Sequence, residues 1–260
     1  MRPLGGASIA PVAGAESASA GAKGAAVVTG GAGGIGRAVL ARLAADGFTP
    51  VSWDLSADAP EAALALSVDV TDPSALAQAA AATRAEAGPI RALIVNAGIL
   101  GPVCPVWEVT PEAIRAVLDT NLLSAFLTLR AVVPAMLANE AVGQDRGRIV
   151  MMASVQAKEG TALSGPYAAS KAGLIALAKT LGKELAGSGI LVNAITPTVV
   201  RTAMERSIGP ERRADLLARI PMGRFAEPRE VAAMVSFLCG PDCSFSTGAV
   251  FDLSGGRSTW

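Results

Sequence analysis

The sequence predicts an α/β fold: one Rossmann-type domain in which a doubly wound parallel sheet of seven strands carries helices on both faces. Three observations support this prediction. Strand-like and helix-like segments alternate along the chain. A glycine-rich turn at residues 29–36 separates the first strand from the first helix, and 260 residues provide one large core without a second set of such signals. The apolar runs that we expect to be strands lie near residues 25–29, 49–54, 65–70, 91–96, 147–153, 190–195 and 249–253.

The first 24 residues precede this pattern. They are rich in Ala, Gly and Ser and have almost no large apolar periodicity, so we expect residues 1–24 to be a disordered or misassigned extension. Their apolar core is too short for a convincing signal peptide. The folded domain is therefore expected at residues 25–260.

The first strand, turn and helix form a dinucleotide-binding pattern. An apolar strand at residues 25–29 leads into a turn that includes Gly30, Gly34 and Gly36, and a helical pattern begins at Ile35. Glycines let the backbone approach a pyrophosphate, and the helix N-terminus stabilises its charge. Because the turn lies between a strand and a helix, we interpret it as a cofactor site and not as a flexible loop.

Asp54 ends the second strand, about 20 residues after the glycines. A carboxylate at this place can accept hydrogen bonds from the adenosine ribose, and it repels a 2′-phosphate. Residues 29–36 and the positions immediately after Asp54 hold no Arg or Lys that could neutralise such a phosphate. The sequence therefore favours NAD over NADP, with a solvated strand-end carboxylate as the alternative.

Two of the later helices have recognisable starts. Asp72 followed by Pro73 opens one of them, and Thr110 followed by Pro111 opens another. The second continues as a long apolar helix in which Asn121 is the odd polar residue and needs a hydrogen-bond partner. We expect Asn121 to anchor a water that relays protons to solvent; a satisfied structural amide is the alternative.

Ser154, Tyr167 and Lys171 can carry proton chemistry. Ser154 follows the buried fifth strand, and Tyr167 and Lys171 are four residues apart in a helical pattern, so their side chains share one face. A phenol with a pKa of about 10 is a weak base near neutrality, but a neighbouring ammonium lowers that pKa. We predict that Tyr167 exchanges a proton with a substrate hydroxyl held by Ser154; a helix surface pair is the alternative. Beside a dinucleotide site, these residues predict an oxidoreductase.

Composition excludes several other functions. The chain has no histidine, which excludes a Ser-His-Asp triad, a His-ligated zinc and a His base. Its formal net charge is zero, which gives no reason to expect nucleic acid or a charged membrane surface. Cys104, Cys239 and Cys243 form no metal pattern and are typical of reduced cytoplasmic thiols. No apolar run approaches the roughly 18 residues of a membrane span, so we expect a soluble protein without a metal.

Together these motifs resemble the short-chain dehydrogenase/reductase family in its compact single-domain form. The resemblance extends from residue 25 to residue 256. The matching positions are Thr29, Gly30, Gly34 and Gly36 at the turn, Asn96, Ala97 and Gly98 after the fourth strand, and Asn121, Ser154, Tyr167 and Lys171. A Tyr-x-x-x-Lys pair alone is a weak signal, whereas four motifs in the correct order are specific.

The resemblance implies a role for each of these residues. Asn121, Ser154, Tyr167 and Lys171 would form the catalytic tetrad, and Lys171 would also bond the nicotinamide ribose. The NAD site would further include Ile35, Asp69 and Val70, the last two beside the adenine, as well as Pro197, Val200 and Thr202. Residues 197–225 would form a mobile lid over substrate and nicotinamide. Family members commonly form tetramers through the helices of Asn121 and Tyr167, so we expect a homotetramer.

The substrate side departs from the family at one point. Most relatives have Pro-Gly where this chain has Pro197-Thr198, which alters the loop near the nicotinamide. Lys158 and Arg201 lie on segments expected to face the pocket, with surface solvation as the alternative for both. Because Arg can bind a carboxylate through two hydrogen bonds, these cations favour a small anionic substrate.

The C-terminal run from residue 243 to Trp260 resembles a subgroup that acts on sugar acids. That subgroup includes 2-keto-3-deoxy-L-fuconate and 2-keto-3-deoxy-L-rhamnonate 4-dehydrogenases, and also sequences labelled as 3-oxoacyl carrier-protein reductases. We expect residues 257–260 to dock on a neighbouring subunit near its pocket, where Trp260 would contact substrate. The predicted reaction is NAD-dependent oxidation of a secondary alcohol on a polar, sugar-derived hydroxy acid.

Two rival functions accompany this prediction. A reductase of 3-oxoacyl thioesters would use the same tetrad with the hydride running the other way. That role normally goes with NADPH, against which Asp54 argues. A non-catalytic nucleotide-sensing regulator would lack the Tyr or the Lys, and this chain has both.

Overall fold

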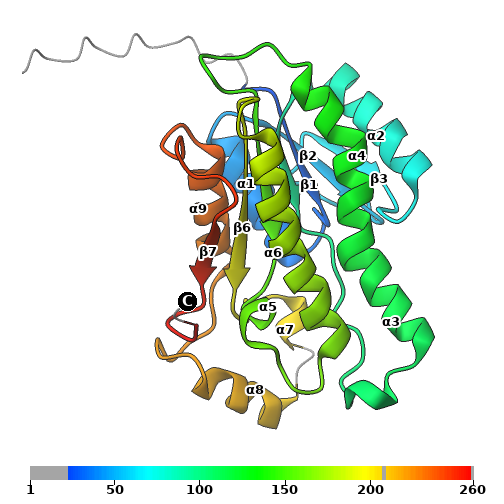
Figure 1. Cartoon of the computed structure of the whole chain (residues 1–260), viewed down its shortest axis with the longest axis vertical. Helices are drawn as coiled ribbons and strands as arrows, with labels where there is room; N and C mark the ends of the chain where they lie inside the picture. The colour runs from blue at the N-terminus through cyan, green and yellow to red at the C-terminus, as the bar shows by residue number, and fades with distance from the viewer. Residues whose placement is uncertain (1–22, 207–208, 259–260) are drawn as a thin grey trace, which may run out of the picture.

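The computed structural model describes residues 23–206 and 209–258 and places their strands in one parallel sheet (Figure 1). The strands are β1 (Ala25–Thr29), β2 (Thr49–Asp54), β3 (Leu64–Ser67), β4 (Ile90–Val95), β5 (Gly147–Met152), β6 (Ile190–Pro197) and β7 (Val250–Leu253). Their order across the sheet is β3-β2-β1-β4-β5-β6-β7. The chain changes direction across the sheet between β1 and β4, and in such sheets ligands bind at this point, beyond the carboxyl ends of the strands.

Helices cover both faces of the sheet (Figure 1). They are α1 (Gly34–Ala45), α2 (Pro73–Glu86), α3 (Pro111–Leu118), α4 (Ser124–Leu137), α5 (Gln156–Glu159), α6 (Gly165–Leu185), α7 (Ala203–Arg206), α8 (Pro210–Ala218) and α9 (Pro228–Cys239), with a 3-10 turn η1 (Val106–Glu108) and a π-helical turn η2 (Asp119–Leu123). One core lies between the sheet and α2, α4 and α6. The other lies between the sheet and α1 and α9.

The strands supply these two cores with alternate residues. In β1, Ala25 and Val27 belong to the core under α2, α4 and α6, whereas Ala26 and Val28 belong to the core under α1 and α9. Successive side chains of a strand point to opposite faces, so a strand covered on both sides must be apolar throughout. The continuous apolar runs of the sequence therefore produce this doubly covered sheet, and the predicted fold class is confirmed.

The third strand is shorter than predicted. It ends at Ser67, whereas the sequence indicated a strand that reached Val70. Asp69 Oδ1 accepts hydrogen bonds from the backbone N–H of Thr71 (2.8 Å) and from its hydroxyl (2.7 Å). This local turn takes the backbone out of the sheet, so Asp69 and Val70 lie in the following loop. The ends of the other strands agree with the prediction within two residues.

The segments α3, η2 and α4 form one continuous helical stretch, Pro111–Leu137. It is 27 residues long, and its most apolar 18-residue window has a mean hydropathy of 1.5. By length and composition it therefore qualifies as a membrane-span candidate, which the sequence analysis did not predict. It packs against β4, α2 and α6, and 39% of its most apolar window is buried within the chain. Core helices have the same properties, so this candidate is weak evidence for a span.

Candidate active site

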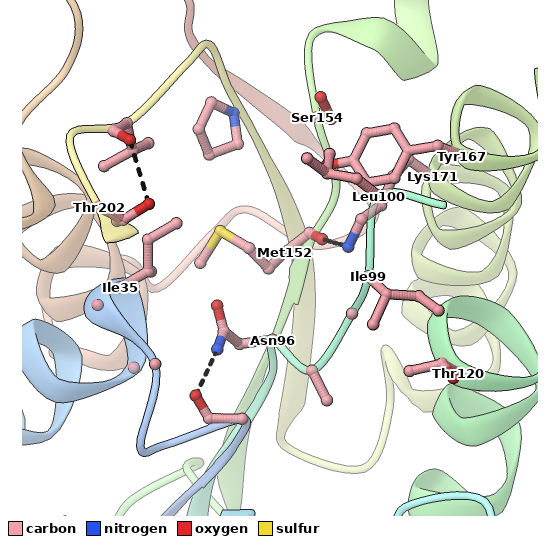
Figure 2. A pocket seen from close by; sticks show the side chains of 18 of the residues that line it. Ile35, Asn96, Ile99, Leu100, Thr120, Met152, Ser154, Tyr167, Lys171 and Thr202 are labelled. Atoms are coloured by element: carbon pink, nitrogen blue, oxygen red, sulfur yellow. Dashed lines mark hydrogen bonds between the residues drawn. The ribbon is translucent and has the colours of Figure 1, made fainter. Parts of the chain in front are cut away.

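A cavity of about 1130 Å³ opens at the carboxyl ends of the central strands. Its wall includes Gly30 after β1, Asn96 after β4, Ser154 after β5 and Thr198 after β6. Figure 2 shows side chains from several separate elements facing this common space. A cavity at this edge is the usual ligand site of an open α/β sheet.

The turn after β1 leaves no room for side chains at Gly30, Gly34 and Gly36. Gly30 has a φ of +68°, in the region that favours glycine. A Cβ on Gly36 would lie 2.2 Å from the carbonyl oxygen of Gly30, and a Cβ on Gly34 would lie 2.8 Å from Thr202 Cγ2. The N-cap of α1, Gly33, has no side chain to bond the first N–H groups of the helix. The start of α1 lines the cavity, and its uncapped N–H groups can bind a pyrophosphate there.

Asp54 ends β2 and lines the cavity. Its Oδ2 accepts a hydrogen bond from the backbone N–H of Ala32 (3.1 Å), which holds the carboxylate beside the glycine turn. The nearby Arg37 follows the turn directly, but its guanidinium pairs with Asp58 (3.1 Å) and Glu61 (3.8 Å). The positive charge of Arg37 is therefore compensated, and Asp54 makes this end of the cavity acidic.

Thr29 lies beneath the cavity and is not part of its wall. Its hydroxyl accepts hydrogen bonds from the N–H groups of Asn96 (2.9 Å) and Ala97 (3.1 Å). Asn96 donates in return to the carbonyl oxygens of Thr29 (3.0 Å) and Gly30 (3.1 Å), and it lines the cavity (Figure 2). This buried residue therefore joins the ends of β1 and β4, and its predicted cofactor contact stays a prediction.

Ser154, Tyr167 and Lys171 converge on the cavity wall. Tyr167 and Lys171 are one turn apart on α6, opposite Ile35 and Thr202 (Figure 2). The Lys171 Nζ donates a hydrogen bond to the carbonyl oxygen of Met152 (2.8 Å), at the end of β5, and lies 5.8 Å from the centroid of the Tyr167 ring. The Ser154 hydroxyl is close enough to the phenol of Tyr167 to lower its pKa. A hydroxyl, a phenol and an ammonium therefore meet at one place.

Burial determines the acidity of the phenol and the ammonium. It lowers the pKa of Lys171 to about 8, because the side chain has almost no contact with solvent. It also raises the pKa of Tyr167, and the nearby Ser154 hydroxyl opposes this rise. The lowered Tyr167 pKa expected from the neighbouring ammonium is thus wrong for the protein alone, because desolvation of the phenolate dominates. Tyr167 is a neutral phenol that can donate its proton.

Sequence comparison identifies the family. The family profile described as Enoyl-(Acyl carrier protein) reductase, of the short-chain dehydrogenase type, matches residues 30–258. The chain belongs to the short-chain dehydrogenase/reductase family. It is 43% identical over 243 residues to a 2-dehydro-3-deoxy-L-rhamnonate dehydrogenase (NAD(+)) of Sphingomonas sp. (strain SKA58), covering 90% of this chain and 95% of the relative. It is 34% identical over 239 residues to the 3-oxoacyl-[acyl-carrier-protein] reductase FabG of Escherichia coli (strain K12), covering 89% and 96%.

Solved structures agree with this family assignment. A 3-ketoacyl-(acyl-carrier-protein) reductase from Brucella melitensis, complexed with NADH, matches with a TM-score of 0.85 and 28% identity, covering 91% of this chain and 99% of that chain. An NAD+-bound xylitol dehydrogenase matches with a TM-score of 0.83 and 31% identity, covering 90% and 98%. As a short-chain dehydrogenase/reductase, the chain is an oxidoreductase.

In this short-chain dehydrogenase/reductase, Asn121 is buried in η2, next to the cavity wall and not on it. Its Oδ1 accepts a hydrogen bond from the N–H of Ile99 (2.8 Å), and its Nδ2 donates to the carbonyl oxygen of Ile99 (2.9 Å) and to Ser170 Oγ (3.0 Å). The amide is thus satisfied within the protein, as the structural alternative requires. A water relay at Asn121 stays a prediction. The neighbouring Thr120, which the sequence did not single out, lines the cavity (Figure 2).

Most of the other predicted cofactor residues lie on the cavity wall. They are Gly30, Gly34, Ile35, Gly36, Asp54, Asp69, Val70, Asn96, Ala97, Gly98, Pro197, Val200 and Thr202. A Cβ on Gly98 would lie 3.1 Å from Asn121 Oδ1 and 3.3 Å from Lys171 Nζ, so a side chain there would crowd both polar groups. Thr198, which replaces the usual glycine, has no left-handed backbone, and its N–H donates to Leu253 O (3.1 Å). This loop therefore does not need glycine.

The predicted substrate cations do not line the cavity. Lys158 is mostly buried and forms an ion pair with Asp252 (3.3 Å), because the short helix α5 directs it towards β7. Arg201 is half-exposed and pairs with Glu227 (3.1 Å). Both expected positions are therefore corrected. Trp260 lies outside the described residues.

Other polar residues occupy the substrate end instead. Gln156, Arg212 and Arg257 line the cavity. Arg212 belongs to α8, within the charged stretch that the sequence indicated as a lid, and Arg257 follows β7. The charged residues of the predicted lid were a sequence signal for a polar substrate end. Which cation points into the cavity depends on the rotation of α8 and on the path of the chain after β7, and neither is visible in the sequence.

Proposed function

We propose that the chain is an NAD-dependent dehydrogenase that interconverts a secondary alcohol and a ketone on a small, sugar-derived hydroxy acid. One observation carries the proposal: Ser154, Tyr167 and Lys171 line the same cavity as the glycine turn and Asp54. A substrate hydroxyl beside Tyr167 would therefore share one space with a dinucleotide held at the turn.

The cofactor assignment rests on the fit of the cavity wall. When bound, NAD would supply the hydride acceptor. Gly30, Gly34 and Gly36 would hold its pyrophosphate, and Asp54 would accept hydrogen bonds from its adenosine ribose. By family resemblance, Asp69 and Val70 would border the adenine, and Pro197, Val200, Thr202 and Lys171 the nicotinamide riboside. The Sphingomonas relative is named for NAD(+), and the Brucella structure holds NADH, which supports the same choice here.

Proton transfer belongs to the chain's own residues. In ketone reduction the neutral Tyr167 phenol would donate its proton to the substrate oxygen, which Ser154 hydrogen-bonds. Oxidation is the reverse step, in which the Tyr167 phenolate takes the proton of the substrate hydroxyl. A charged Lys171 stabilises the phenolate, and the carbonyl of Met152 holds its Nζ in position. Asn121 would hold a water that connects Lys171 with solvent.

The relatives support a sugar-acid substrate, and so does Asp54, which disfavours the NADPH that thioester reductases normally use. The Sphingomonas enzyme is named for a sugar acid, whereas the less similar Escherichia coli reductase is named for 3-oxoacyl carrier protein. A 3-oxoacyl thioester reductase is the second candidate, and the Brucella structure favours it. A non-catalytic nucleotide sensor is disfavoured because Tyr167 and Lys171 both line the cavity.

The first experiment follows absorbance at the reduced-nicotinamide band, with NAD and NADP tested separately. Substrates are secondary alcohols, sugar acids with their keto forms, and a 3-oxoacyl thioester. We expect turnover of a hydroxy acid with NAD and a loss of at least about 10²-fold in kcat for Tyr167→Phe, which cannot exchange a proton. Lys179→Met, on the exposed side of the same helix, is the matched control. Preference for NADPH with the thioester would overturn the proposal.

We also propose the domain limits, assembly and location expected from the sequence. Residues 25–260 would form one dinucleotide-binding and catalytic domain, with residues 197–225 as its lid. The protein would be a cytoplasmic homotetramer that acts on a small molecule. Among the described residues, Cys104, Cys239 and Cys243 are free thiols, which supports a reducing compartment.

A further inference from the structure

Arg257 is a buried cation whose donors are only partly used. Its side chain is 3% exposed, and its Nε donates to Glu159 Oε2 at 3.0 Å. The Nη2 lies 3.0 Å from the same oxygen, but its N–H bonds are not aimed at it, so within the described residues this buried nitrogen forms no hydrogen bond. A guanidinium carries five N–H donors, and leaving buried donors unpaired is costly. Because Arg257 lines the cavity, a ligand there can accept a hydrogen bond from its guanidinium.

The backbone around Arg257 is fixed in advance. The N–H of Ser258 donates to Ser254 Oγ (3.0 Å), and the N–H of Met222 donates to the carbonyl oxygen of Gly255 (3.1 Å). Gly256 has a φ of +87°, which turns the chain back towards the cavity. Arg257 therefore reaches the cavity from a segment tied to its surroundings on both sides.

Arg212, on α8, reaches the start of the helix that carries Tyr167. Its Nη2 donates to Ser164 Oγ (3.2 Å), and Ser164 is the N-cap of α6, three residues before Tyr167. This places the guanidinium within about one helical turn of Tyr167. The next arginine, Arg213, forms an ion pair with the buried Glu205. Among the described residues, Arg212 instead bonds the neutral hydroxyl of Ser164.

The charge and polarity of this end of the cavity fit a hydroxylated anion. Glu159 compensates the charge of Arg257 and Glu205 that of Arg213, so among the described residues Arg212 carries the uncompensated positive charge at this end. Gln156 and Thr198 also line the cavity, and each has a buried side-chain oxygen without a hydrogen-bond partner among the described residues. The hydroxyl groups of a sugar acid can satisfy them. The acyl chain of a fatty thioester would leave them unpaired.

We propose that Arg257 and Arg212 form a carboxylate-binding site that selects hydroxy acids over neutral alcohols and acyl thioesters. The inference rests on the proposed dehydrogenase function and deepens it. Guanidinium groups bind carboxylates through charge-assisted, often paired hydrogen bonds. Arg257 provides a fixed contact, and Arg212 adds one from the lid next to Tyr167. Binding of the carboxylate therefore helps to place the substrate hydroxyl beside the phenol.

The test compares an acid with its neutral form. The probes are 2-dehydro-3-deoxy-L-rhamnonate and its methyl ester, assayed with Arg212→Gln, Arg257→Lys and the unmodified protein. For the acid, we expect each variant to raise KM by about 10- to 100-fold with a smaller change in kcat, since a hydrogen bond to a charged group is lost or misaligned. For the ester, KM should change by less than about 3-fold, because its neutral carbonyl interacts only weakly with the guanidinium.

Controls separate binding from folding. Arg219→Gln, at the exposed end of α8, removes a surface pair with Asp215 and should leave KM for both probes unchanged. Thermal unfolding identifies a variant that fails to fold. If Arg257→Lys fails to fold, Arg212→Gln still tests the proposal. Arg212 is partly exposed, so its replacement should not prevent folding.

Three results distinguish the carboxylate site from the proposed function. Equal losses for acid and ester would overturn the carboxylate site and make the arginines structural. If the unmodified protein reduces only thioesters, and the acid does not raise its melting temperature, the site and the proposed function both fail. If the acid stabilises the unmodified protein but not the arginine variants, the carboxylate site stands even though the reaction is a different one.

Discussion

At the scale of single residues, Lys171 is buried at the active site, where its positive charge would stabilise the Tyr167 phenolate. Its pKa lies at about 8, against an ordinary value of 10.5, because burial disfavours the ammonium. Between these two pH values the unfolded chain binds more protons than the folded one, so this residue makes stability rise with pH across that window. Below pH 8 the burial penalty is fully present.

Replacing Lys171 should therefore stabilise the fold while it inactivates the enzyme. Lys171→Met is expected to increase the free energy of unfolding at pH 7 by about 1–3 kcal/mol, which is the burial penalty less the hydrogen bond to Met152. The gain should shrink as the pH rises from 8 towards 10.5. Urea unfolding at pH 7 and pH 10 measures it, with the exposed Lys179→Met as control. A gain of the same size at both pH values would contradict the burial argument.

Sequence reasoning succeeded for residues fixed by a strand end or by helix spacing. Ser154 follows a buried strand, and Tyr167 and Lys171 are spaced by one helical turn, so their place on the wall follows from the pattern. The cations at the substrate end, such as Lys158 and Arg257, could not be placed from the sequence. The direction of Lys158 depends on the four-residue helix α5, and that of Arg257 depends on a glycine turn after β7.

At the scale of elements, the start of α9 is closed by an ion pair. Arg224 donates two hydrogen bonds to Glu230 (2.6 and 2.8 Å), and Glu230 accepts another from the N–H of Glu227 (2.8 Å). The Arg224 hydrogen bonds, and then the Glu227 N–H, hold the pKa of Glu230 at about 2. Because α9 packs against α1, this cap also supports the helix that begins at the glycine turn.

Loss of the Glu230 charge should loosen this helix start. Glu230→Gln is expected to lower the free energy of unfolding at pH 7 by about 1 kcal/mol, a typical value for a lost cap and a modest one because the pair is partly exposed. The Glu230 contribution is present above pH 4.5 and is lost as the pH falls towards 2, so the difference from the unmodified protein should narrow below pH 4.5. Urea unfolding at pH 7 and pH 3.5 tests this. The exposed Glu184→Gln should show no such trend, and a difference independent of pH would sink the argument.

Element boundaries were predictable where apolar runs end at glycine or proline. The early end of β3 was not, because Asp69 forms a side-chain turn that competes with strand pairing without a break in the apolar pattern. The π-helical turn η2 was also invisible in the sequence. It coincides with tertiary hydrogen bonds, because Asn121 in this turn bonds both backbone groups of Ile99 on a neighbouring loop.

At the scale of the whole molecule, the helical stretch of α3, η2 and α4 has an uncovered apolar side. Leu123, Phe126 and Leu137 are 46%, 50% and 42% exposed. Large apolar side chains exposed along one helical stretch are typical of protein interfaces. They support the proposal that copies of the chain associate through this stretch and α6.

A charge on that side should break the assembly. Phe126→Glu is expected to reduce the particle mass in light scattering from that of a tetramer to that of a dimer or monomer, because a carboxylate would be buried unpaired in the contact. Val142→Glu, on an exposed loop, should keep the mass unchanged. An unchanged mass for Phe126→Glu would place the interface elsewhere.

The glycine turn also limits how the chain can diverge over evolutionary time. The clash that a Cβ at Gly36 would meet is with a backbone oxygen, 2.2 Å away, so no rotation of a neighbouring side chain relieves it. The opposite wall, with Arg212 and Arg257, is held by side-chain contacts that can be exchanged one at a time. After gene duplication, copies of such a chain can therefore acquire new substrates and still bind the same dinucleotide cofactor.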